Sequence, residues 1–227
     1  MTKELVRQYY TDSVRKEWRR LVADPYHQLE FDTTLYFLEK YLPDQGHVLD
    51  AGGGPGRYTI ELAGRGYELT LLDFTPANLD FARRRIQRAG VKKKVRVAKP
   101  GAPIFVSVMS RLSMIIVELI LFQYEIELPH FKQIRDTGDY PGGYGFTPCH
   151  FFLPEELRSD FESKPVEILD MAGLEGISSN HRKEFNQLHK NEVRRKIWLE
   201  THYLTCTHPA VVATSEHILI VCRKRTD

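Results

Sequence analysis

The sequence predicts an α/β protein in which a mostly parallel sheet carries helices on both faces. Residues 47–51 and 68–73 are short apolar runs typical of buried strands, and helical patterns follow them at 57–65 and 75–89. Parallel neighbours need a crossover connection, so this strand–helix–strand–helix alternation indicates parallel βαβ units.

Helices are expected before the first strand. Residues 2–22 and 30–41 have helical spacing, and the pair Asp24-Pro25 interrupts the pattern between them. We expect residues 1–45 to form a helical segment that precedes a main domain over 46–227.

The C-terminal half is less regular than the first hundred residues. A loop rich in glycine, proline and tyrosine covers 136–149, and we expect loop or helical insertions at about 112–160 and 178–208. The predicted strands are 103–109, 166–171 and 217–224; the predicted helices are 112–122, one that starts at Pro154, and 182–204.

Composition excludes several protein classes. The chain has 227 residues with 42% apolar side chains and a formal net charge of +2, which fits a globular domain and is too weakly basic to indicate nucleic acid. Three cysteines without C-x-x-C spacing indicate reduced thiols in the cytoplasm, and no spacing indicates a metal site. The apolar stretch 102–122 contains Arg111 and Glu118, so it predicts a strand and a core helix rather than a membrane span.

A glycine-rich turn follows the first predicted strand. Residues without side chains allow the backbone to approach a ligand closely, and the next helix offers its amide groups. Asp73, at the end of the second strand, is placed to accept hydrogen bonds from the two hydroxyls of a ribose. The turn reads Asp50-Ala51-Gly52-Gly53-Gly54-Pro55-Gly56.

A nicotinamide or flavin dinucleotide is the competing ligand for such a turn. Its G-x-G-x-x-G pattern requires glycine at position 57 or 59, where this sequence has Arg57 and Thr59. Asp50, two positions before the first glycine, favours a ligand with a positively charged group over a pyrophosphate.

The segment from Val48 to Asp73 resembles motif I and the following acid of class I S-adenosylmethionine-dependent methyltransferases. The resemblance implies a Rossmann-like sheet of the seven-stranded type, S-adenosyl-L-methionine as cofactor, and a helical lid over residues 1–45. It also implies that Phe74 covers one face of the adenine and that Asp73 binds the ribose. The methionine part would be held by Asp50, Gly52, Gly53, Gly54 and Gly56.

Two aromatic residues of the N-terminal helix are candidates for closing over the cofactor. They are Tyr10 and Trp18, and the alternative for each is ordinary packing of a lid helix.

The spacing after Asp73 departs from the family. Lys99 follows Asp73 by 26 positions, and the helix at 75–89 uses most of them. The run VRVAKPGAPIFVSV resembles the lead into the fifth strand of these enzymes, yet a crossover of about a dozen residues is required before it. We therefore expect that a segment containing the fourth strand is missing near residues 94–97, together with adenine and acceptor contacts.

Acceptor-side residues are expected in the 136–152 loop. His150 is a candidate general base, with a structural hydrogen-bonded histidine as the alternative, and Tyr140 and Tyr144 are candidates for lining the acceptor site. The pair Glu216-His217 at the start of the last strand is interpreted as structural.

The acceptor is expected to be a small molecule. A basic cluster spans Arg83 to Arg96, but a solvated helix face and loop explain it without RNA. An RNA-directed methyltransferase and a non-catalytic S-adenosylmethionine-binding protein stay open as alternatives. No membrane partner is expected, and a homodimer is one option for the assembly.

Overall fold

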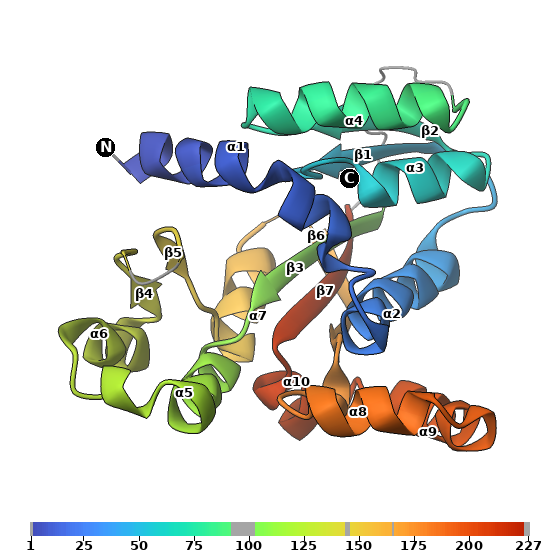
Figure 1. Ribbon diagram of the computed structural model, residues 1–227. Helices are drawn as coiled ribbons and strands as arrows, with labels where there is room; N and C mark the ends of the chain where they lie inside the picture. Colours follow the sequence, from blue (N-terminus) through green and yellow to red (C-terminus); the bar gives the residue numbers. More distant parts are fainter. Residues whose placement is uncertain (1, 92–102, 144–145, 165, 225–227) are drawn as a thin grey trace. The chain divides into compact units, whose positions relative to one another are not determined.

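Strands β1 (His47–Ala51) and β2 (Glu68–Leu72) pair in parallel, with Asp50 opposite Leu71. Helix α3 (Arg57–Gly64) connects them and α4 (Pro76–Arg88) follows β2, which confirms the predicted βαβ unit (Figure 1). The computed structural model describes residues 2–91, 103–143, 146–164 and 166–224.

Helix α4 packs its apolar stripe onto this strand pair. Ala82 and Ile86 are buried against Leu71, because residues four apart lie on one face of a helix. Helix α1 (Thr2–Arg20) also packs on α4, and its Trp18 ring is 5.8 Å from the Phe81 ring. The first helix predicted from the sequence, α1, thus packs on α4.

A separate three-stranded sheet forms the core of the C-terminal half. Its order is β3 (Pro103–Met109), β7 (His217–Lys224) and β6 (Val166–Gly173), with antiparallel pairing throughout. Successive side chains of central β7 point to opposite faces, so Ile218 and Ile220 enter one apolar cluster while Leu219 and Val221 enter another.

Helices and a short hairpin surround this sheet. Helix α2 (Pro25–Tyr41) contributes Phe37 to the cluster around Leu219. Asp24 caps α2, since its Oδ1 accepts hydrogen bonds from the backbone amides of Tyr26 and His27 at 3.0 and 3.1 Å. The others are α5 (Arg111–Leu121), α6 (Pro129–Thr137), α7 (Pro154–Glu162), α8 (Arg182–His189), α9 (Glu192–Thr205) and α10 (Pro209–Thr214), with the 3-10 turns η1 (Gln123–Glu125) and η2 (Gly176–Ser178) and the hairpin β4 (Asp139–Tyr140) and β5 (Cys149–His150).

The chain divides into two compact units. The first contains residues 1–21 and 42–100, and the second contains 22–41 and 101–227. This division separates α1 from α2, whereas the sequence groups both in a segment over 1–45. The lid function of that segment stays a prediction.

The sheet differs from the predicted one. Among the described residues β1 and β2 form a two-stranded parallel sheet, and β3, β7 and β6 form an antiparallel one, in place of one mostly parallel seven-stranded sheet. Strands β3 and β6 still run in the same direction, because both are antiparallel to β7. The missing segment predicted near 94–97 falls within 92–102, outside the described residues.

Helix α2 begins at Pro25, five residues before the predicted start at 30, and the other predicted elements occur close to their expected bounds. The pattern at 182–204 is two helices, α8 and α9, and the 136–149 loop contains the end of α6 and strand β4. Within the described parts of the chain, no helix is both long and apolar enough to cross a membrane.

Candidate functional site

The glycine turn is fixed by the strand that lies beside it. The amides of Gly52 and Gly53 both donate to the Leu72 carbonyl, at 2.7 and 3.2 Å. Gly52, Gly54 and Gly56 have φ of +74°, +55° and +83°, in the left-handed region that disfavours residues with a side chain. Three glycines of the turn are therefore required by backbone geometry alone.

Gly53 is required for another reason. A Cβ atom there would lie 2.5 Å from the carboxylate atoms of Asp50, so the backbone passes directly over this acid. The Asp50 carboxylate also accepts a hydrogen bond from the Thr59 hydroxyl in α3. The acid at the end of β1 is thus enclosed between the turn and the helix that follows it.

Asp73 is attached to the same turn. Its Oδ2 accepts a hydrogen bond from the backbone amide of Gly54 at 2.8 Å, and its Oδ1 accepts from the backbone amide of Thr75 at 2.8 Å and from the side-chain Nδ2 of Asn78 at 3.1 Å. A carboxylate offers about four acceptor positions, so capacity for a ligand hydroxyl is left. To accept hydrogen bonds from both ribose hydroxyls, the Asp73 carboxylate must lose one of these three protein donors.

Burial and the charge of Asp73 both act on the Asp50 carboxyl. Burial raises the pKa of Asp50, and the nearby Asp73 charge raises it further, while hydrogen bonds from Thr59 oppose the shift. No lysine or arginine of the described chain forms an ion pair with either acid. A positively charged ligand group would stabilise both carboxylates.

The surroundings of the turn fit a ligand that contains cationic and hydrogen-bonding groups. Nothing lies within 4 Å of a Cβ built on Gly52, so there is space beside the turn. Asn78 is buried and its Oδ1 has no hydrogen-bond partner, which leaves an acceptor available. Phe74, predicted to cover the adenine, is 60% exposed and presents an apolar ring next to Asp73. The chemistry of S-adenosylmethionine, with its sulfonium, ammonium and adenine, matches this set.

The two lid candidates lie in α1. Trp18 contacts the first residue of α3: the Arg57 guanidinium lies 3.9 Å from the centre of the indole ring, and its Nε donates to the Trp18 carbonyl at 3.1 Å. The Tyr10 ring meets the ring of Tyr9 edge-on at 5.2 Å. Closure of either ring over the cofactor stays a prediction.

The acceptor candidates lie in the second unit. His150 in β5 is 34% exposed, and its Nδ1 lies 2.7 Å from Asp139 Oδ1 in β4. Hydrogen bonding to His150 is the main cause that lowers the pKa of Asp139. Tyr140 is 7% exposed and packs against Ile134 and Phe151, while Tyr144 lies outside the described residues.

A cluster at the start of β7 was interpreted as structural from the sequence. His217 lies opposite Met109, the last residue of β3, at the carboxyl edge of that strand. Its Nδ1 is 2.7 Å from Glu175 Oε1 and 3.8 Å from Glu30 Oε2. Glu175 is 2% exposed, and although burial raises its pKa, the charge and hydrogen bonds of His217 bring the pKa below its usual value. A histidine held by a buried carboxylate is an arrangement suited to proton transfer.

Two groups in the second unit have the composition of metal sites, although no spacing in the sequence indicated one. Each brings three side-chain ligand atoms within 4.8 Å of one another among the described residues. Their members are Glu30, Glu175 and His217 in one group, and Glu118, Glu125 and His130 in the other.

Comparisons with known proteins agree with the geometry of the turn. Residues 48–106 match the family model described as a methyltransferase domain. A Bacillus subtilis (strain 168) protein named "Putative methyltransferase YqeM" is 34% identical over 56 residues, which is 25% of this chain and 23% of that protein. The match thus spans about a quarter of this curated relative.

Solved structures share the fold at low sequence identity. A S-adenosylmethionine-dependent methyltransferase from Methanosarcina mazei superposes with a TM-score of 0.54 and 16% identity, covering 84% of this chain and 98% of that one. Geranyl diphosphate C-methyltransferase from Streptomyces coelicolor A3(2), solved with S-adenosyl-L-homocysteine, superposes with a TM-score of 0.53 and 13% identity. The superposition covers 98% of each chain.

Residues 48–106 thus match a methyltransferase domain, and the chain shares the fold of S-adenosylmethionine-dependent methyltransferases.

Proposed function

We propose that the protein transfers the methyl group of S-adenosylmethionine to a small-molecule acceptor. The observation that carries the proposal is the pair of acids, Asp50 and Asp73, which both contact one glycine turn and have no ion-paired lysine or arginine among the described residues. Such a pair fits a ligand that supplies positive charge and hydroxyl donors together.

Each residue of the turn has a role in this proposal. Asp50 and the glycines 52–56 hold the methionine part, Asp73 accepts from the ribose, and Phe74 covers one face of the adenine. The bound cofactor supplies an electrophilic methyl group. The protein then orients the acceptor for in-line attack and, for a hydroxyl or amine, removes its proton.

His217 is our candidate for that proton transfer. Its Nδ1 lies 2.7 Å from Oε1 of Glu175, a buried carboxylate that orients the ring. His150 with Asp139 is the second candidate. The presence of such pairs favours catalysis over a protein that only binds the cofactor.

Small-molecule acceptors are favoured over RNA by the weak net charge of +2. The Streptomyces coelicolor relative, by its name, acts on a small molecule, which supports the same choice. A cytoplasmic location belongs to this proposal, since Cys149, Cys206 and Cys222 are free thiols, as is usual in a reducing compartment.

Calorimetry on the intact chain tests the proposal directly. We expect saturable binding of S-adenosylhomocysteine and no binding of NAD at the same concentration. Turnover is then measured as S-adenosylhomocysteine released from S-adenosylmethionine across a panel of small hydroxyl, amine and thiol acceptors, with a structured RNA as comparison. Tighter binding of NAD contradicts the cofactor assignment, and release only with RNA contradicts the acceptor class.

A further inference from the structure

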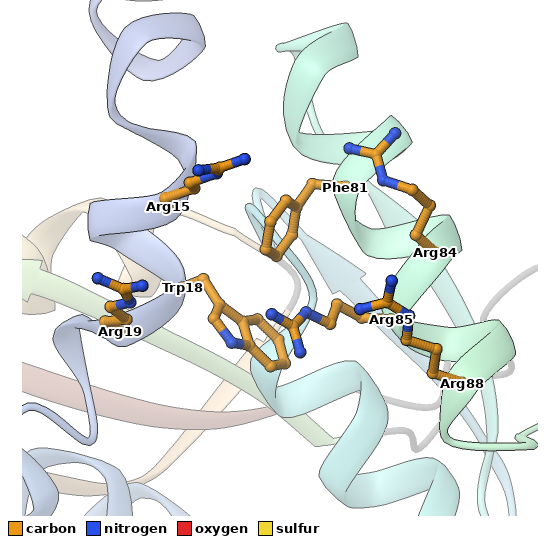
Figure 2. A pocket seen from close by; sticks show the side chains of 7 residues that line it. All are labelled: Arg15, Trp18, Arg19, Phe81, Arg84, Arg85 and Arg88. Carbon is orange, nitrogen blue, oxygen red and sulfur yellow. The ribbon is translucent and has the colours of Figure 1, made fainter.

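A cleft lies in the first unit, along the surface where α1 meets α4. It encloses about 280 Å³ and contains side chains from both helices, as Figure 2 shows. No residue of the glycine turn and neither Asp50 nor Asp73 lines it. The lining residues are Arg15, Trp18, Arg19, Phe81, Arg84, Arg85 and Arg88.

Every charged residue that lines this cleft is an arginine. Five guanidinium groups therefore share one cavity in a protein whose net charge is only +2. Within the described parts of the chain none of the five forms an ion pair with a carboxylate. Because like charges repel, this arrangement favours the binding of an anion.

Other arginines on the same helices do have acidic partners. Arg83 in α4 lies 2.6 Å from Asp80, and Arg20 in α1 lies 3.5 Å from Glu17. Neither Arg83 nor Arg20 lines the cleft. The arginines without carboxylate partners are thus those that point to the cavity, which a general solvated face does not explain.

The aromatic rings of Trp18 and Phe81 contact the guanidinium group of Arg85. The Arg85 guanidinium lies 4.9 Å from the Trp18 ring centre and 5.2 Å from that of Phe81. Guanidinium groups stack on aromatic faces and keep their N–H donors directed outward, where phosphate oxygens bind them in pairs. The rings thereby orient the donors before any ligand arrives.

We propose that this cleft binds a compact phosphorylated molecule with at least two phosphate groups. Two observations favour a compact ligand over a nucleic acid strand. The arginines come from two helices and converge on one concavity, whereas a strand needs an extended basic track. The volume is at the lower end for small-ligand sites. Trp18, a candidate for closing over the cofactor, lines the cleft, but no residue of the glycine turn does, so phosphate binding here can be tested separately from methyl transfer.

Inorganic pyrophosphate is the first probe, titrated calorimetrically into the intact chain at low salt. We expect saturable binding with one site, which weakens as salt rises because the contacts are charged. The double variant R84Q/R88Q should weaken it by roughly tenfold or more, since each removed guanidinium donates charge-assisted hydrogen bonds. R83Q is the matched control: the same change on the same helix, outside the cleft, should alter the affinity by less than about twofold.

The alternatives give distinct results. Circular dichroism of R84Q/R88Q shows whether the variant folds, and glutamine keeps the helix propensity of these exposed positions. Absence of saturable pyrophosphate binding, or equal weakening by R83Q, overturns the proposal. A single-stranded oligonucleotide that binds while pyrophosphate does not would show an extended nucleic-acid surface instead, and also overturns it. The same proteins are also titrated with S-adenosylhomocysteine. Loss of pyrophosphate binding can then be distinguished from a failure of the cofactor assignment.

Discussion

The Asp73 carboxylate accepts a hydrogen bond from the Gly54 amide at 2.8 Å. In the sequence the glycine turn and the acid after β2 are separate motifs, but in the structure this hydrogen bond joins them. The same carboxylate also accepts from Thr75 and Asn78, at the start of α4. The conformation of the turn and the position of the ribose-binding acid are therefore set together.

Removal of the Asp73 carboxylate should weaken cofactor binding. We expect D73A to lose about 1–3 kcal/mol of S-adenosylhomocysteine affinity, the cost of hydrogen bonds left unmade. D80N is the matched control, because Asp80 lies in α4 and its side chain is exposed. Calorimetry compares the variants, and equal affinity of D73A and the unchanged protein would contradict the ribose assignment.

The close contact between Gly53 and Asp50 predicts a coupling between two substitutions. G53A should destabilise the fold by about 1–3 kcal/mol, because the new Cβ would lie 2.5 Å from the Asp50 carboxylate. In a D50A background the carboxylate is absent, so the same substitution should cost less. Urea unfolding of the four proteins measures this double-mutant cycle.

G64A provides the control for that cycle. Gly64 ends α3, and nothing lies within 4 Å of a Cβ built there, so its replacement should be neutral or slightly stabilising. Additive effects of G53A and D50A would show that the two residues do not interact as the structure indicates.

The two candidate bases can be distinguished by kinetics. With an acceptor that supports turnover, H217Q should lower kcat by about 10²–10⁴-fold, the range for loss of general base catalysis, and leave S-adenosylhomocysteine affinity unchanged. H150Q should have a smaller effect, because the side chain of Asp139, the partner of His150, is 58% exposed, whereas Glu175, the partner of His217, is 2% exposed. If H150Q instead causes the large loss, His150 is the base and the Glu175–His217 pair is structural.

His202 should make stability depend on pH. Burial lowers its pKa to about 4, and its Nε2 lies 2.9 Å from Thr33 Oγ1. Since the folded-state pKa is below the unfolded value of about 6.5, protonation favours unfolding. The contribution is complete above pH 6.5 and falls by about 3 kcal/mol as the pH decreases through 4.

Chemical denaturation at several pH values tests this dependence. In H202Q the free energy of unfolding should change less between pH 6.5 and 4 than in the unchanged protein, because the titrating imidazole is gone. Identical slopes for both proteins would exclude His202 as a source of the acid sensitivity.

The sequence by itself predicted the first βαβ unit and its turn. Apolar runs at 47–51 and 68–73, with glycines and an acid at fixed positions, depend on local backbone geometry and on neighbours close in the chain. The need for glycine at positions 52, 54 and 56 can be predicted in this way, because a positive φ is a property of a single residue.

Only the tertiary structure brought the remaining candidate sites together. Glu30, Glu175 and His217 come from α2, from the turn after β6 and from the start of β7, and no short spacing connects them. The arginine cleft likewise requires α1 and α4, which are separated in sequence by the whole βαβ unit. Side chains far apart in the chain meet through packing of apolar faces on different elements, and the linear pattern of one element does not specify its partner.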